Sequence, residues 1–273
     1  MTITPTGNPP RKREPIFSIP AVVIGLVAVL VGVHALLQVF GEATRDQIYF
    51  SWGFVPGRFT AAVAPSWIAD LINRAANNDD ALATARMLRD SGALDGGAGW
   101  TTFFTYALLH GSWAHVGVNS IWIVAFGPPV ARRFGAWRFI AFFFFTSIVG
   151  AFAQWLAAPF EAIPMVGASA ADSGLMAAAA RFIFRPDATV LIATGGPLSA
   201  PASTLRELLV DRRAWFFIVV WMVTNFLFGA GATSLGASDA PVAWVAHVGG
   251  FLAGLLAFSL FDRRDASARP STF

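Results

Sequence analysis

The stretch APVAWVAHVGGFLAGLLAFSLF, residues 240–261, decides the fold, because it runs for 22 residues without a charged side chain. A helix needs roughly 20 apolar residues to cross about 30 Å of hydrocarbon. Uncharged runs of similar length also cover residues 16–40, 139–160 and 214–238. The sequence therefore predicts at least four membrane-spanning helices.

Two weaker segments bring the expected number of spans to six. One lies in the uncharged stretch 96–131. The beginning of this stretch is polar, so we place the span in its later part, at about 113–131. The other, at about 166–184, is weaker because Asp172 interrupts it. We expect an all-α polytopic membrane protein, a six-helix bundle over residues 16–261 with tails at 1–15 and 262–273. Its spans are expected at about 16–40, 113–131, 139–160, 166–184, 214–234 and 242–261.

The basic residues give an independent test of this topology, because Lys and Arg gather in cytoplasmic loops. If both termini are cytoplasmic, the inner segments hold 14 of the 19 basic residues, and the other five lie in the long first outer loop, 41–102. We therefore expect a multi-pass protein of a bacterial cytoplasmic (inner) membrane with both termini inside. Within the outer loop, a helix-like segment from Pro65 to Leu88 indicates an ordered cap.

The composition excludes several kinds of function. The basic residues are dispersed at span ends and form no dense patch with aromatic residues, so a nucleic-acid partner is not expected. The chain has no cysteine, which excludes disulfides, thiolate nucleophiles and cysteine-ligated metals. The sequence leaves the oligomeric state open.

Polar side chains inside a membrane are costly and mark candidate functional sites. Here they gather at the starts of the second, fourth and sixth spans, which all run from outside to inside in this topology. Their first residues are therefore expected at similar depth. The polar residues are His110, His115 and Asn119 at the second span, Ser169 at the fourth and His247 at the sixth.

Ser169 and His247 have the chemistry of a nucleophile and its base. A serine hydroxyl attacks well only when a neighbouring base takes its proton, and a neutral imidazole is the usual partner near pH 7. Gly250 and Gly254 lie on the same stripe of the sixth span as His247 and allow close helix packing, which would bring Ser169 within reach. No acid is placed to orient His247, so we expect a dyad.

The negative charge that develops on a tetrahedral intermediate needs hydrogen-bond donors. The backbone N–H of Ser169 at a helix start and the side chains of His115 and Asn119, which share a helix face, would provide them.

Three ordered motifs resemble the rhomboid family of intramembrane serine proteases. They are H-x4-H-x3-N from His110 to Asn119, G-x-S from Gly167 to Ser169, and A-H-x-G-G-x-x-x-G from Ala246 to Gly254, within a resemblance over about residues 101–261. The resemblance implies a serine endopeptidase that cuts transmembrane protein substrates within lipid, without metal or cofactor. It implies a nucleophile at Ser169, a general base at His247, an oxyanion hole at His115, Asn119 and Ser169, and supporting roles for His110, Gly167, Gly250 and Gly254.

The sequence departs from the family pattern in three places. Ala170 follows the serine where the family usually has Gly, and Ala131 stands in the loop 129–135 where the family often has Glu. The first outer loop offers Trp52-Gly53 in place of a Trp-Arg pair. Asp172, three residues after Ser169, either points toward the cleft or is a structural carboxyl group.

Two other functions stay open at this point. A rhomboid-like pseudoprotease would bind transmembrane clients without cutting them, which is motivated by Ala170. A small transporter is motivated only by the number of spans, because the sequence shows no inverted repeat and no pair of broken helices.

Overall fold

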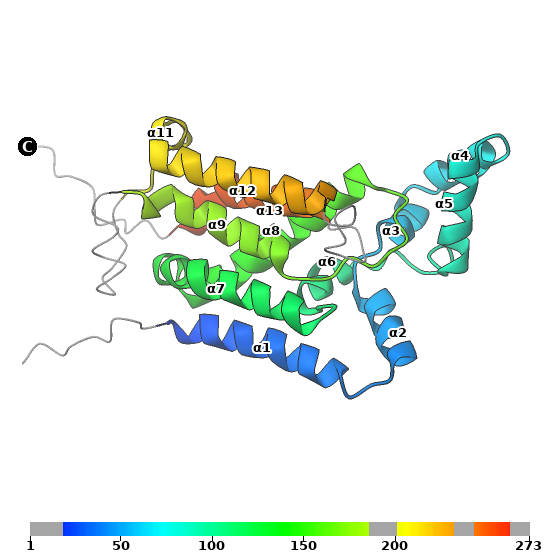
Figure 1. Cartoon of the computed structure of the whole chain (residues 1–273), viewed down its shortest axis with the longest axis horizontal. Coiled ribbons are helices and arrows are strands. Elements are labelled where there is room, and N and C mark those ends of the chain that lie inside the picture. The colour runs from blue at the N-terminus through cyan, green and yellow to red at the C-terminus, as the bar shows by residue number, and fades with distance from the viewer. Residues whose placement is uncertain (1–18, 186–200, 232–242, 263–273) are drawn as a thin grey trace, which may run out of the picture.

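A computed structural model describes residues 19–185, 201–231 and 243–262 (Figure 1). Throughout these residues the regular structure is helical, apart from one isolated antiparallel bridge between Phe54 and Met165. The predicted tails at 1–15 and 262–273, except for Asp262, lie outside the described residues, as do residues 186–200 and 232–242.

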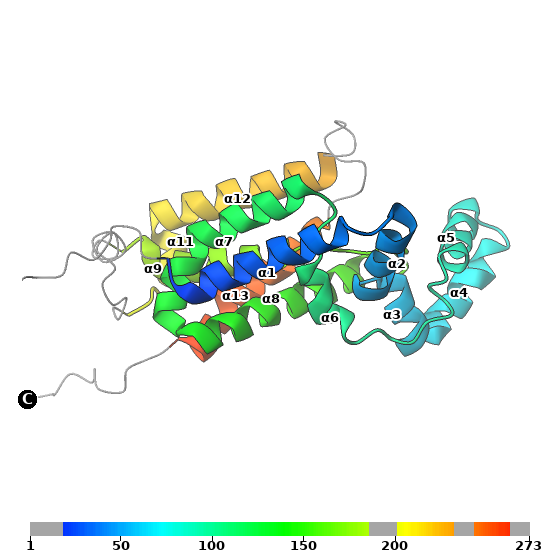
Figure 2. The same cartoon turned by 90° about the horizontal axis from the view of Figure 1, so that it is seen from below.

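Six long helices of the described chain form the bundle, and each falls within or overlaps one predicted span. Three of them, α7, α8 and α13, are long and apolar enough to cross a membrane, and α1 is apolar but shorter. In both views α12 lies at the edge of the bundle (Figures 1 and 2). The six helices are α1 (Ala21–Leu37), α7 (Trp113–Phe134), α8 (Ala136–Ala157), α9 (Ser169–Ile183), α12 (Arg212–Gly231) and α13 (Trp244–Phe261).

Small residues let α13 pack closely against α8 and α9. Gly250 lies directly on the backbone of Ala170, and Gly254 lies on the backbone of Gly174, so that a Cβ atom at either position of α13 would overlap α9. Close backbone approach through small residues is a common way for membrane helices to associate. The two glycines therefore make the helix contact that the sequence predicts.

The segment predicted as the first outer loop folds, together with the residues just after it, into a helical cap at one end of the bundle (Figure 1). The helix-like segment expected from Pro65 to Leu88 is divided in two, because Asn78 caps a new helix by accepting the N–H of Ala81 at 2.9 Å. The cap helices are α2 (Glu42–Trp52), α3 (Pro56–Val63), α4 (Pro65–Ala75), α5 (Asp79–Asp90), α6 (Thr102–Thr105) and the 3-10 turn η1 (Tyr106–Leu108).

A buried arginine holds the start of this cap together. Arg58 is only 8% exposed, and its guanidinium donates to the carbonyl oxygens of Phe50 at 2.8 Å and Gly53 at 3.2 Å. These bonds tie the end of α2 to α3.

The opposite end of the bundle is closed by a buried ion pair. The guanidinium of Arg133 binds Asp262 through two hydrogen bonds, from Nε to Oδ1 at 2.8 Å and from Nη2 to Oδ2 at 2.9 Å. This pair joins the end of α7 to the end of α13. A short helix, α11 (Leu205–Val210), precedes α12 and begins with a capping box between Thr204 and Glu207.

The expectation of a loop over residues 129–135 is wrong. Helix α7 continues through Pro128 and Pro129 to Phe134, and Ala131 is 3% exposed within it. Packing against neighbouring helices compensates for the hydrogen bonds that proline removes. The helix ends only at Gly135, whose φ of 80° reverses the chain into α8.

Candidate active site

Ser169 is the first residue of α9, and the chain before it is shaped by a glycine. Gly167 has a φ of 120°, a conformation that side chains rarely adopt, and its N–H donates to the carbonyl of Tyr106 at 3.0 Å. The next residue already has helical angles. This sharp entry places Ser169 in the first turn, where backbone N–H groups have no partner within their own helix.

His247 lies in the first turn of α13, at the same end of the bundle as Ser169. Its Nε2 atom is 2.7 Å from Ser169 Oγ, although the two residues are 78 positions apart in sequence. Both side chains are partly exposed. The structure therefore brings this predicted pair into direct hydrogen-bond contact.

A third side chain, which the sequence analysis missed, contacts the other nitrogen of His247. Asn225 of α12 is 9% exposed, and its Oδ1 atom is 2.7 Å from His247 Nδ1. From the sequence, we expect no acidic residue that could hydrogen-bond to His247. Among the described residues, the amide of Asn225 makes this contact instead. Asn225 is the only amide side chain in the uncharged run 214–238, and an amide inside a span is a signal that could have found it.

The two predicted oxyanion donors of α7 lie beside the entry to α9. Ser112 caps α7 by accepting the N–H of His115 at 3.1 Å, which places His115 in the first turn. A Cβ atom on Gly167 would lie 2.6 Å from His115 Nε2 and 3.5 Å from the Asn119 amide, so glycine is needed there for space as well as for its φ. His115 and Asn119 are thus next to the backbone that leads into Ser169.

Asn119 is also the centre of a buried network. The amide orientation that satisfies its neighbours has Nδ2 donating to Asp172 Oδ2 at 3.2 Å, and Oδ1 accepting from His110 Nε2 at 2.9 Å and from the N–H of Ala168 at 3.2 Å. Asp172 is 3% exposed, and its Oδ1 has no hydrogen-bond partner among the described residues. Of the two interpretations of Asp172, this contact favours the structural one.

His110 fixes the segment that enters α7. Its carbonyl accepts two hydrogen bonds, from His34 Nδ1 at 2.9 Å and from the Tyr49 hydroxyl at 2.8 Å, and so joins this segment to α1 and α2. Burial, together with the nearby imidazoles of His115 and His34, lowers the pKa of His110 to about 3. Its ring is therefore neutral at physiological pH.

The methyl group of Ala170, the residue at which the sequence departs from GxSG, fits against α8. Ala170 is 1% exposed and faces Gly150, where a Cβ atom would lie 2.6 Å from that of Ala170. The missing side chain at Gly150 leaves room for the extra methyl. Ser169 and His247 therefore reach each other without displacement by Ala170.

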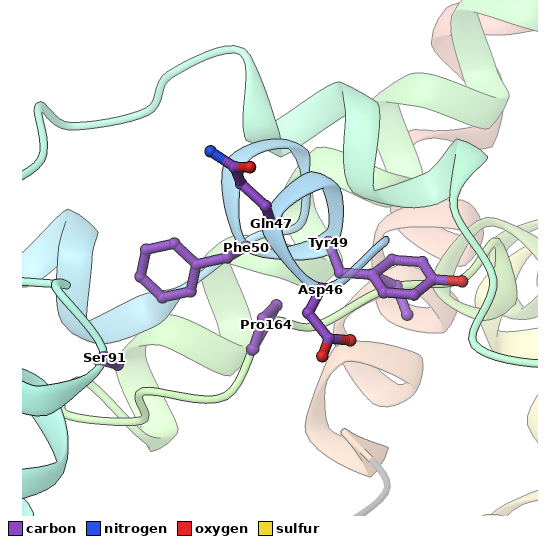
Figure 3. Close-up of a pocket in the computed structure, with 7 residues that line it drawn as sticks. Asp46, Gln47, Tyr49, Phe50, Ser91 and Pro164 are labelled. Atoms are coloured by element: carbon purple, nitrogen blue, oxygen red, sulfur yellow. The ribbon is translucent and has the colours of Figure 1, made fainter. Parts of the chain in front are cut away.

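A separate pocket of about 560 Å³ lies in the cap and contains neither Ser169 nor His247 (Figure 3). It adjoins Pro164 and Val166, which lead toward Ser169. No group of three or more His, Asp or Glu side chains that could hold a metal occurs in the described part of the chain. The pocket is lined by Asp46, Gln47, Tyr49, Phe50, Ser91, Pro164 and Val166.

Comparison with known families gives a match. The Rhomboid domain family matches residues 97–264, which is more than half of the chain and includes every polar residue of the candidate site. No curated protein matches the sequence. The prediction of a helical, polytopic membrane fold is confirmed by this match and by the helical bundle, and the chain belongs to the rhomboid family of integral membrane proteins.

Proposed function

We propose that this protein is an intramembrane serine endopeptidase that cleaves transmembrane segments of other membrane proteins. The observation that supports this most directly is the 2.7 Å contact between Ser169 Oγ and His247 Nε2. A hydroxyl and an imidazole at this distance form the pair that nucleophilic catalysis requires. Both belong to first turns of helices in a membrane bundle, and both are partly exposed.

In the proposed reaction, Ser169 Oγ attacks the carbonyl carbon of a peptide bond while its proton passes to His247 Nε2. The tetrahedral intermediate collapses, the C–N bond breaks, and His247 returns the proton to the leaving amine. A water molecule then gives a proton to His247 and attacks the acyl-enzyme ester. The second tetrahedral intermediate collapses, the bond between the acyl carbon and Ser169 Oγ breaks, and His247 returns the proton to Oγ, which releases the carboxylic acid and restores Ser169.

The charge on the tetrahedral oxygen would be stabilised by three donors. They are the N–H of Ser169 at the positive end of α9, the side chain of His115 beside Gly167, and the second N–H of the Asn119 amide, whose first N–H is held by Asp172. The network through Asp172 and His110 would hold the Asn119 amide in one orientation. Preorganised donors of this kind usually contribute strongly to acyl transfer.

The proposed substrates are transmembrane helices, and the proposed surroundings are lipids of a bacterial cytoplasmic membrane with both termini inside. Large apolar side chains are exposed on the outer faces of several bundle helices, which suits contact with lipid. Arg133 and Arg181 lie at the bundle end away from Ser169, in agreement with a cytoplasmic position for that end. The exposed apolar residues include Ile121, Phe216, Val223, Leu256 and Leu260.

A fluorophosphonate probe and a cleavage assay test the proposal. The probe should label the wild-type protein and should fail on Ser169→Ala, and a reconstituted single-span substrate should be cut by the wild type but not by His247→Ala. Equal labelling of wild type and Ser169→Ala would contradict the assignment of the nucleophile. Binding of the substrate without cleavage or labelling would instead support the pseudoprotease.

A further inference from the structure

We propose that Asn225 is a positioning residue that completes a Ser-His-Asn arrangement by holding His247 in the tautomer and orientation that a general base needs. This inference rests on the proposed protease function. It concerns α12, a helix that the motifs of the sequence do not include, and it assigns a role to the one buried polar side chain described there.

The amide of Asn225 is held from two sides. Its Nδ2 donates to the backbone carbonyl of Trp244 at 3.2 Å, and its Oδ1 faces His247 Nδ1 at 2.7 Å. A backbone carbonyl can only accept a hydrogen bond, so the Trp244 contact decides which end of the amide is nitrogen. The oxygen of Asn225 is therefore the atom that faces the imidazole.

This amide orientation fixes the proton on His247. An amide oxygen can only accept, so His247 Nδ1 must carry the hydrogen in this contact. In the neutral imidazole, Nε2 then has the free lone pair, and it accepts a hydrogen bond from Ser169 Oγ at 2.7 Å. The carbonyl of Trp244 thus determines, through Asn225, that Nε2 is the basic nitrogen at the serine.

The amide is placed by the packing of α12 against α13. One helical turn away from the contact, the ring of Trp221 stacks on that of Phe251, with centroids 4.2 Å apart and an angle of 17° between the planes. These two residues are four positions from Asn225 and His247 on their respective helices, so the two contacts lie side by side. The orientation of His247 is therefore linked to the docking of α12.

The tautomer of His247 can be measured directly. The chain has four histidines, so selective 15N labelling of the full protein in micelles gives few signals, and His247→Gln identifies that of His247. We expect the wild type to carry its proton on Nδ1 of His247. In Asn225→Leu, which is close in size but accepts no hydrogen bond, we expect a shift toward the Nε2-protonated form.

Kinetics supply the second readout. Asn225→Leu should lower kcat for a reconstituted substrate about 10- to 100-fold with little change in KM, because the base is misplaced while substrate binding is retained. Asn225→Asp keeps an acceptor oxygen and should recover part of this loss. Thr224→Val, which changes an exposed polar residue next to Asn225 on α12, is the matched control and should leave kcat unchanged.

The possible outcomes separate this inference from the proposed function. An Asn225→Leu protein with the wild-type tautomer and wild-type kcat overturns the positioning role. If the wild type neither cuts nor labels, the proposed function fails, and the tautomer measurement still decides whether Asn225 sets the proton on His247. If Asn225→Leu does not fold, the tautomer of His247 in Asn225→Asp tests the inference. Because aspartate keeps an acceptor oxygen, the proton should stay on Nδ1, and its loss from Nδ1 in the folded variant would overturn the inference.

Discussion

The methyl group of Ala170 on α9 faces Gly150 on α8, and the two positions share the volume of one side chain. This relationship explains how the fold accommodates an alanine directly after the serine. The methyl group of Ala170 fills the space that a side chain at Gly150 would occupy. Ser169 Oγ and His247 Nε2 remain 2.7 Å apart.

Gly150→Ala should destabilise the bundle. The new Cβ atom would lie 2.6 Å from the Cβ of Ala170 and 2.7 Å from the carbonyl oxygen of Ala246, so helices would have to separate. Overpacking of this kind typically costs about 1–3 kcal/mol. Thermal unfolding in detergent measures the loss. Gly32→Ala on α1, where a Cβ meets nothing within 4 Å, should be neutral or slightly stabilising, and an equal loss of stability in both variants would contradict the packing.

Ala170→Gly should leave turnover within about threefold of the wild type, since the loss of one buried methyl costs roughly 1 kcal/mol of stability and does not move the reacting groups. The rate of fluorophosphonate labelling at Ser169 checks this expectation. A large gain of labelling in Ala170→Gly would show instead that the methyl group hinders the nucleophile.

Asp172→Leu and Asp172→Asn should differ. Leucine removes the acceptor of the Asn119 Nδ2 hydrogen bond and leaves a buried donor unpaired, which we expect to lower kcat roughly tenfold or more. Asparagine can still present an oxygen to Asn119, so it should retain most of the activity. Steady-state kinetics on the two purified variants provide the comparison. Equal damage by both substitutions would mean that the carboxyl group itself is required.

Removal of the carboxylate of Asp262 should weaken the bundle without altering the site. Asp262→Leu breaks a pair with Arg133 whose side chains are 7% and 5% exposed, and breaking a buried pair costs about 3–5 kcal/mol. The melting temperature should fall, while the folded fraction still labels at the wild-type rate. As a control, Asp90→Leu disrupts an exposed pair with Arg89 and should leave the melting temperature unchanged.

The helices of the bundle could be predicted because each depends on a long local pattern. The uncharged runs correspond to α1, α8, α12 and α13, since the cost of charge in hydrocarbon acts on every residue of a span. The ends of helices were less predictable. Helix α7 continues past Pro129 to Phe134, because tertiary packing stabilises a segment that local preference would end.

Some residues of the candidate site could also be predicted from the sequence, and others could not. Ser169, His247, His115 and Asn119 stand in motifs with fixed spacing, so the amino-acid sequence alone is enough to single them out. Asn225 stands in no motif, and the sequence gives no reason to pair it with a histidine 22 positions later.

The sequence by itself determined that this chain is a helical membrane protein and which polar residues could form its chemistry, because hydrophobic length and motif spacing are local properties. The tertiary structure alone decided that Asn225 meets His247, that Asp172 meets Asn119 and that Gly150 admits Ala170. Each of these contacts joins different helices, and its existence depends on how side chains pack at distances of a few ångströms.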